Sequence, residues 1–512
     1  MSISTGIPES WMLPLFYATV DGSMAGNLTQ QEPALIVGQY NAAWPGGVGT
    51  AGANIAVPVG SPQLASVMFG PGSMLAWMVN AFFAVNTTQL VYALPVPEPT
   101  GNKAAATITF AASSGQSGLW SLYIGDSLVQ WESLSTDTGA LCAADCVTAI
   151  NAWADGHLVL PVTAALTTCG GDEVTITCNW AGLTGNDLYV GFNYLGTNGG
   201  QATPVGWTAT VSAAAGGTGE PVFTNAIANI QAMEFDYVAL PYTDTGSMGI
   251  WNTEYGFSSS GRWNYTRQQY GMILNAVRHN YADAVTWGLG QNSPVMSTLV
   301  VELGAPSPAW NWAATYSGLA SLAFTDDPAR PLQTLELIGI LPAPLHNRFS
   351  QAELNNLCQS GLAVQAVAPS GHAMILREST QYQLNSYGQG DTAFGLLTVL
   401  ATLQALLKRM KSAITSKYPR VKLVPNGTKL GPGQAAVTPS VLKGEIVAEF
   451  VHAEYDGLVA DKTDFVNNLV VEIDDSNPNR VNVLWPPQLA GQLRQFAALA
   501  QFRLLYPTVN LD

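Results

Sequence analysis

Three short, mainly apolar runs constrain the fold of this chain more than any other feature of its sequence. They lie at residues 34–38, 90–94 and 235–240 and have the composition of strands that are buried on both faces. Strands of this kind are typical of parallel sheets that are covered by helices. A helix is expected between the first two runs, at about residues 62–85. The β–α–β order predicts an α/β core that contains parallel strands.

The composition changes sharply in the middle of this core. Residues 101–218 are rich in Thr, Gly, Ser and Ala, and their apolar residues alternate in short runs. Strands are predicted at 106–110, 119–124, 174–180, 188–194 and 207–211, with one helix at 138–154. We therefore expect a β-rich insert at 101–218 that splits the core into residues 26–100 and 219–372.

The remainder of the core and a separate C-terminal α+β domain follow the insert. A helical stretch is expected near residues 267–279 and a strand at 335–340. Within the C-terminal domain, residues 373–498, leucines at helical spacing make 394–411 the best helix of the chain. Strands are predicted at 444–455, 465–473 and 481–484, and an amphipathic helix at 488–499.

Both ends of the chain are predicted to be extended arms, at residues 1–25 and 499–512. Pro8 and Pro14 exclude a helix through the first arm. Apolar side chains in a terminal arm need a cover, which is either their own domain or the sheet of a neighbour. The candidate arm residues are Leu13, Leu15, Phe16, Tyr17, Val20, Phe502, Leu504, Leu505 and Tyr506.

The charge is low and unevenly distributed. Only 11% of the residues are charged, against about 25% in ordinary soluble domains, which suits a surface covered by other copies. Residues 1–261 hold 17 acids and one base, Lys103, whereas residues 262–512 hold 18 of each. The acidic half argues against a nucleic-acid partner, because phosphate contacts require Lys and Arg. No signal peptide is visible, and the apolar stretch 74–85 is too short to span a bilayer, so we expect a soluble protein without membrane insertion.

Motifs for catalysis and cofactors are weak. The five histidines form no HExxH motif, and no GxSxG motif occurs. Residues 47–52 match GxGxxG, but residues 54–58 cannot begin the helix whose N-terminus would hold a pyrophosphate. We expect a flexible loop there and no cofactor.

A row of alternating side chains lies in the predicted strand 444–455 and just beyond it. On a strand, Phe450, His452, Glu454 and Asp456 would share one face. The last three could hold a metal ion, although such a row is more often a solvated strand face.

Four cysteines fall in the insert and a fifth, Cys358, stands apart. Their spacings fit a zinc site poorly. Two interpretations have equal weight: disulfides that form once the protein leaves the reducing cytosol, or buried free thiols. The pairing cannot be deduced from the sequence. The possible disulfide residues are Cys142, Cys146, Cys169 and Cys178.

A basic run follows the best helix. From Lys408 to Lys443 the chain holds eight Lys and Arg residues, and no acid occurs between Asp391 and Glu445. The first three bases sit near the end of the predicted helix, where cations are favourable. The run is either a solvated helix end or a basic strip that faces an acidic partner.

Taken together, several segments resemble the tail sheath proteins of Mu-type contractile phages. They are Ile7-Pro8 with Leu-Pro-Leu-Phe-Tyr-Ala at 13–18, Ala-Leu-Ile-Val-Gly-Gln at 34–39, Phe-Gly-Pro-Gly-Ser-Met-Leu at 69–75, Asp-Tyr-Val-Ala-Leu-Pro-Tyr-Thr-Asp at 236–244, and Arg-Val-Asn-Val-Leu at 480–484 followed by Pro486-Pro487 and Gln501-Phe502-Arg503. These segments occur in order over nearly the whole chain. The cysteine-bearing insert departs from the usual pattern.

The resemblance implies a structural role without enzyme activity. Members of this family form stacked hexameric rings around a tail tube, exchange arm strands with neighbours and contract to drive the tube through the host envelope. The implied partners are further copies of the chain, the tail tube protein, and the baseplate and tail terminator proteins. The implied location is the tail sheath of the virion, assembled in the host cytoplasm.

The resemblance also assigns positions within the assembly. Part of the core is expected to have a subtilisin-like fold, the insert to lie outermost, and the C-terminal domain to face the tube. The tube-facing candidates are Leu489, Gln492, Arg494, Gln495, Lys408, Arg409 and Lys411. The alternatives are a tail tube or capsid protein, and a hydrolase built on a subtilisin-like core.

Overall fold

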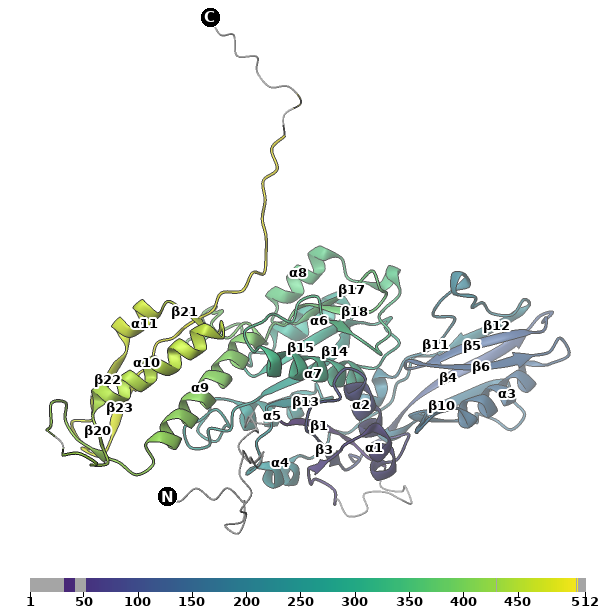
Figure 1. Cartoon of the computed structure of the whole chain (residues 1–512). Helices are drawn as coiled ribbons and strands as arrows, with labels where there is room; N and C mark the ends of the chain where they lie inside the picture. Colours follow the sequence, from purple (N-terminus) through teal and green to yellow (C-terminus); the bar gives the residue numbers. More distant parts are fainter. Residues whose placement is uncertain (1–31, 42–51, 430, 503, 505–512) are drawn as a thin grey trace, which may run out of the picture.

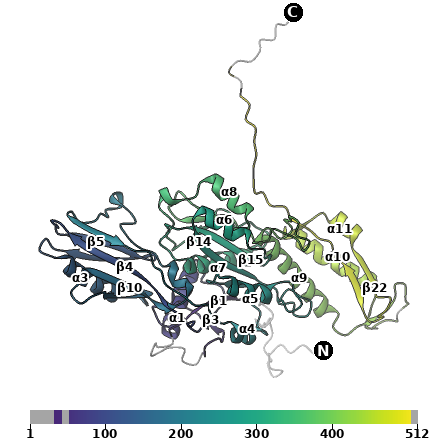
Figure 2. The same ribbon diagram turned by 180° about the vertical axis from the view of Figure 1, so that it is seen from behind.

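The protein consists of three parts that lie in a row (Figure 1). The computed structural model describes residues 32–41, 52–429, 431–502 and 504. The core, which holds β1–β3 and β13–β18 with their helices, lies in the middle. The insert, from β4 to β12, lies at one end, and the C-terminal part, from α9 to β24, lies at the other. Figure 2 shows the same order from behind.

The core is built on a six-stranded sheet in the order β15-β14-β13-β1-β3-β2. Every neighbouring pair is parallel except β2 and β3. The strands are β1 (Ala34–Gln39), β2 (Val57–Pro58), β3 (Val91–Val96), β13 (Tyr237–Ala239), β14 (Met272–His279) and β15 (Met296–Glu302). The three apolar runs of the sequence are thus β1, β3 and β13. They are buried and parallel, as predicted, and β1 lies between the other two.

Two helices, α2 (Met74–Phe83) and α7 (Ala309–Asp326), pack on each other and on the sheet. The single helix predicted for 62–85 is wrong, because α1 (Pro62–Phe69) and α2 are separate. Gly70 ends α1 with φ of 93°, a conformation that favours glycine, and the Ser73 side chain caps α2.

The second half of the core differs from the prediction at one strand. Residues 267–279 were expected to be helical, but 272–279 form β14 and pair with β13 and β15. Its apolar run is short and buried, a pattern that does not separate helix from strand. The other elements are α4 (Thr224–Ile230), α5 (Thr245–Tyr255), α6 (Tyr281–Leu289), β16 (Glu336–Leu337), η3 (Leu345–Asn347), α8 (Gln351–Gln359), β17 (Val364–Val367) and β18 (Ala373–Arg377).

The insert contains two antiparallel sheets that enclose an aromatic cluster. One sheet has the order β12-β4-β10-β9 and the other β11-β5-β6. Ring contacts join Phe110, Trp120, Trp131, Phe192 and Trp207. The elements are β4 (Lys103–Ala112), β5 (Gly118–Ile124), β6 (Ser127–Ser133), α3 (Gly139–Ala152), β7 (Ala154–Asp155), β8 (Leu158–Val159), β9 (Val162–Leu166), β10 (Glu173–Ala181), η1 (Leu183–Asp187), β11 (Val190–Phe192), η2 (Thr197–Gly199) and β12 (Trp207–Val211). All five strands and the helix predicted here are present.

The C-terminal part is more helical than predicted. Residues 444–455 lie in a helix, α10, and not in a strand, because Leu442, Ile446, Phe450 and Ala453 recur at helical spacing on its buried face. The predicted strand 465–473 divides into the end of α11 and all of β22. The elements are α9 (Leu397–Lys417), β19 (Lys422–Leu423), β20 (Ala436–Val437), α10 (Pro439–Tyr455), β21 (Val459–Ala460), α11 (Lys462–Asn468), β22 (Val470–Ile473), β23 (Val481–Leu484) and β24 (Gln488–Leu489).

The last described residues contradict the predicted amphipathic helix at 488–499. Gln488 and Leu489 form β24, and residues 490–502 and 504, here called the C-terminal segment, have no helix or strand. Residues 490–494 stay bonded to the body, and the rest of the segment runs away from it (Figure 1). A helix of this composition would need an apolar surface to cover one face, and the described part of the chain provides none beside residues 495–502.

Trp120 should be essential to the stability of the insert. Its side chain is fully buried, and its indole nitrogen donates to Ser133 Oγ at 3.1 Å. We expect Trp120→Ala to lower the free energy of unfolding by about 3–5 kcal/mol, measured by urea denaturation. Leu119→Ala, on the same strand but 47% exposed, is the control and should cost about 1 kcal/mol or less. Equal losses in the two variants would contradict this packing.

Candidate interaction surfaces

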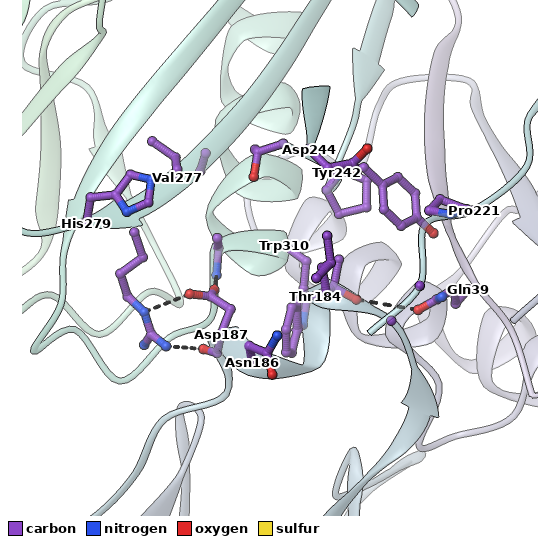
Figure 3. A pocket seen from close by; sticks show the side chains of 18 of the residues that line it. Gln39, Thr184, Asn186, Asp187, Pro221, Tyr242, Asp244, Val277, His279 and Trp310 are labelled. Carbon is purple, nitrogen blue, oxygen red and sulfur yellow. Dashed lines mark hydrogen bonds and ion pairs between the residues drawn. The ribbon is translucent and has the colours of Figure 1, made fainter. Parts of the chain in front are cut away.

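The first candidate site is a cavity of about 360 Å³ at the carboxyl ends of β1, β13 and β14 (Figure 3). Ligands of open α/β sheets bind at this edge, so it is the place to test the hydrolase alternative. Its histidine, His279, packs its ring 6.4 Å from that of Trp287, and burial lowers the pKa of the imidazole. Asp244 Oδ1 accepts from Ser247 N at 2.7 Å and caps α5. The described residues that line the cavity include no Ser or Cys. The cavity therefore places no serine or cysteine nucleophile beside a base.

The same cavity lies where the insert meets the core. At this boundary two carboxylates of the insert bind groups of the core. Asp187 pairs with Arg278 of β14 at 2.8 Å and also accepts from the amide of Ala309. Asp126, in the turn between β5 and β6, accepts from Asn311 Nδ2 of α7 at 3.0 Å. Burial raises the pKa of both carboxyls, that of Asp126 to about 6. These groups hold the insert to the core and are therefore structural.

The motif candidates do not form a metal or nucleotide site. No group of three or more His, Cys, Asp or Glu residues that could bind a metal occurs in the described part of the chain. Phe450, His452, Glu454 and Asp456 belong to α10 and its C-cap, so they do not share a face as they would on a strand. Of the GxGxxG match at 47–52, only Gly52 lies within the described residues.

The cysteines are free thiols in the structure. Cys142, Cys146 and Cys178 are buried in the insert, whereas Cys169 is exposed. Burial raises the pKa of Cys142 and Cys178 to about 12 and that of Cys146 further. The two interpretations of the insert cysteines, disulfides or buried free thiols, stay predictions, and only Cys142, Cys146 and Cys178 are buried.

The basic run does not form one exposed strip, which corrects the placement of Lys408. Its side chain is only 9% exposed and is ion-paired with the buried Asp236, which precedes β13. Burial raises the pKa of Asp236 to about 7, although Lys408 opposes the shift. Arg409 pairs with Asp456 at 2.5 Å on the surface, and Lys411 is exposed. Lys408 therefore joins α9 to the core sheet, and only its neighbours remain available to a partner.

Three of the four candidates in the C-terminal segment and β24 also face the body of the protein. Gln492 and Arg494 are half-buried and hydrogen-bonded to the core, and Leu489 packs against the C-terminal core. Gln495 is exposed. Sequence reasoning did not identify Glu378, the partner of Arg494, because the two residues are 116 positions apart.

The C-terminal segment carries uncovered apolar side chains. Leu493, Phe496, Leu499, Phe502 and Leu504 are 75–90% exposed. Isolated exposed apolar residues are ordinary, but five within twelve residues of an extended segment indicate a surface that another chain covers. The remaining arm candidates, Leu13, Leu15, Phe16, Tyr17, Val20, Leu505 and Tyr506, lie outside the described residues.

A second uncovered surface is the ribbon formed by β22 and β23. These strands pair only with each other among the described strands, from Val470↔Leu484 to Ile473↔Val481. Val470, Val483 and Leu484 are more than 40% exposed. A two-stranded ribbon is marginally stable alone, and its edges present unpaired backbone groups to a further strand.

Comparison with known proteins identifies the family. The profile of the phage tail sheath C-terminal domain matches residues 389–503. The Mu-like prophage FluMu tail sheath protein of Haemophilus influenzae is 34% identical over 508 residues, which cover 98% of this chain and 100% of that protein. The chain belongs to the phage tail sheath family. This tail sheath protein is thus a structural protein of a contractile tail or injection system, and the predicted non-enzymatic role is consistent with the family.

Solved sheath structures resemble this tail sheath protein more distantly. The sheath tail protein of Desulfitobacterium hafniense gives a TM-score of 0.46 at 11% identity, over 94% of this chain and 97% of that one. The contracted sheath of an extracellular contractile injection system gives 0.43 at 8% identity, over 98% and 99%. Within the described residues of this tail sheath protein, no helix has the length and apolarity needed to cross a membrane.

The raised pKa of Asp126 predicts a specific pH dependence. Because the folded-state value of about 6 exceeds the ordinary 3.8, the stability that Asp126 contributes is complete below about pH 4 and is lost as the pH rises through 6. Asn cannot ionise, so the Asp126→Asn variant should not show this loss. Between pH 4 and pH 7 its free energy of unfolding should gain up to about 3 kcal/mol relative to that of the wild type. Urea denaturation at pH 4, 5, 6 and 7 measures the difference. Asp155 is an exposed acid of the insert, so Asp155→Asn controls for the loss of one charge. Parallel pH profiles for the wild type and Asp126→Asn would contradict the prediction.

Proposed function

We propose that this tail sheath protein polymerises as stacked hexameric rings around a tail tube and that its terminal arms donate strands to neighbouring copies. The observation that carries the proposal is the C-terminal segment, which leaves the body extended and with its apolar side chains uncovered. An extended apolar segment gains main-chain hydrogen bonds and apolar cover at once when it joins the edge of another sheet.

The pattern of the last described residues fits strand addition. Phe502 and Leu504 are two residues apart, so on a strand their side chains share one face. The β22–β23 ribbon supplies open edges and exposed apolar residues to receive such a strand. Because the donating and receiving surfaces differ, the contact is head-to-tail and generates rings or a helical tube.

The arrangement of the parts supports an orientation within the sheath. The insert and the C-terminal part lie at opposite ends of the core (Figure 1). If the C-terminal domain, residues 373–498, faces the tube, the insert at 101–218 lies outermost. The split core at 26–100 and 219–372 then forms the wall of the sheath, and its parallel sheet is consistent with the proposed subtilisin-like fold.

In this proposal the assembled sheath is metastable and contracts when the baseplate triggers it. The arms at residues 1–25 and 499–512 keep neighbours connected while their bodies rotate, and the tube is driven through the host envelope. The tail tube, baseplate and tail terminator proteins are the proposed partners, and assembly takes place in the host cytoplasm before the sheath becomes part of the virion.

Deletion of either arm tests strand donation. We expect variants lacking residues 1–20 or residues 499–512 to remain folded but to form no tubes. In the described part of the second deletion, Leu499, Phe502 and Leu504 are more than 80% exposed, so its loss should cost the body little. Circular dichroism monitors the fold, and electron microscopy of concentrated protein, alone and with the tube protein, detects assembly. Tubes of normal length from either deletion would contradict the role of that arm.

Charge reversal tests the tube-facing surface. Arg409→Glu with Lys411→Glu should weaken co-assembly with the tube protein by about tenfold or more, because both side chains are exposed at the surface, where Arg409 also pairs with Asp456. Lys408 is left unchanged, since it is paired with Asp236 inside the protein. Lys103→Glu, on the insert, is the control. Equal co-sedimentation of the double variant and the control with the tube would reject this surface.

A further inference from the structure

The C-terminal segment is attached to the body at one buried ion pair. The guanidinium of Arg494 contacts both carboxylate oxygens of Glu378, with Nη1 2.9 Å from Oε2 and Nη2 on Oε1. The side chain of Glu378 is 0% exposed and that of Arg494 is 14% exposed. A bidentate, charge-assisted contact of this kind fixes both the position and the direction of the arginine.

Further hydrogen bonds surround the pair and connect the segment to the stretch between α7 and β16 and to α9. Gln492 Oε1 accepts from Arg494 Nε at 2.8 Å, and Gln492 Nε2 donates to the carbonyl of Ala329, which follows α7, at 2.7 Å. Thr398, in the first turn of α9, donates to Gln492 Oε1 at 3.3 Å. Gln333 Nε2 reaches the carbonyl of Leu493 at 3.3 Å. The attachment is therefore built into the body and does not depend on the pair alone.

The attachment stops abruptly after Arg494. Within the described residues 495–502 and 504, no hydrogen bond or ion pair to the body is found, and Phe496, Leu499 and Phe502 are more than 80% exposed. The boundary between the fixed and the free part of the C-terminal segment thus falls at one residue.

Glu378 in turn is fixed to the core sheet. It directly follows β18, and its carbonyl accepts from Leu397 N at 3.1 Å. The carbonyl of the next residue, Ser379, accepts from Ser297 Oγ of β15 at 2.7 Å.

The links of the segment to the C-terminal part are of two kinds. One is the two-residue pairing of β24 with β21 and the hydrogen bond of Ala490 N to the carbonyl of Leu458. The other is the contact of Gln492 and Arg494 with Thr398, in the first turn of α9, where Leu397, Leu400 and Ala401 pack in the hydrophobic core of the main body.

We propose that Glu378 and Arg494 form the anchor of the C-terminal arm, which transfers the pull between neighbouring copies into the core sheet and not into the small C-terminal part. Both are positioning residues: the anchor sets where the free arm begins and thereby its reach. The proposal rests on the proposed strand donation, because an arm that joins no neighbour carries no load.

The choice of variants follows from the burial of the pair. Arg494→Met alone would leave the Glu378 carboxylate buried without a partner and would destabilise the body, which confounds any effect on assembly. Glu378→Gln with Arg494→Met removes both charges at similar volume, so the body should stay folded while the bidentate contact is lost. Arg494→Lys keeps the charge but not the fork geometry and should show the same effects at smaller size.

Three measurements on the full-length chain test the anchor. Limited digestion with chymotrypsin, which cleaves after Leu and Phe, should cut the wild type at Phe496 and beyond, whereas the double variant should also be cut after Leu493 and Leu489. Urea denaturation should show an unfolding midpoint of the monomer close to that of the wild type. Electron microscopy and sedimentation should show that the double variant needs about tenfold more protein to form tubes, or forms none.

A matched pair provides the control. Lys417→Met with Glu445→Gln removes an ion pair of the same C-terminal part, in which the side chain of Lys417 is 52% exposed, and should leave digestion and assembly unchanged. The proposal is overturned if the double variant forms tubes at the wild-type concentration, or if its segment resists cleavage after Leu493. Tubes from the variant lacking residues 499–512 would instead reject strand donation itself, so the two failures can be told apart.

Discussion

The parallel pairing of β1 with β13 is the contact on which the rest of the molecule depends. Ala34, Leu35 and Ile36 pair with Tyr237, Val238 and Ala239, about two hundred residues later in the chain. Closing a loop of this length costs entropy, which the burial of three apolar strands at the centre of the sheet offsets. Residues 101–218, between β3 and α4, lie outside this sheet and form the insert.

Three ion pairs with largely buried side chains lie at the joints between the parts of the chain. Arg278 and Asp187 join the insert to the core, Lys408 and Asp236 join α9 to the core sheet, and Arg494 and Glu378 fix the C-terminal segment. Buried pairs of this kind add little net stability, because desolvation opposes their attraction. They do penalise wrong arrangements strongly, since a displaced partner leaves a buried charge alone. A protein that must keep its parts aligned within an assembly gains specificity from such pairs.

The surfaces left uncovered in the single chain are of a different kind. The C-terminal segment exposes apolar side chains on an extended backbone, and the β22–β23 ribbon exposes open edges. An isolated protein would be at risk of aggregation from both features. Under the proposed strand donation the two surfaces are complementary, and Arg494 is the last described residue of the segment that is bonded to the body.

The sequence by itself determined the elements whose own residues show a clear pattern, either a fully apolar run or a regular alternation. The buried runs became β1, β3 and β13, the alternating runs of the insert became its strands, and the leucines at helical spacing marked α9. The ordered set of family segments also identified the chain, and the Haemophilus relative confirms this.

Tertiary structure alone decided the rest. Residues 444–455 and 272–279 contain short apolar runs that suit either helix or strand, and only the surfaces they meet select one. Lys408 and Arg494 looked like surface cations, but Asp236 lies 172 residues from the first and Glu378 lies 116 residues from the second. No local pattern can reveal such partners, because a charge is stable in the interior only when folding brings its counter-charge to it.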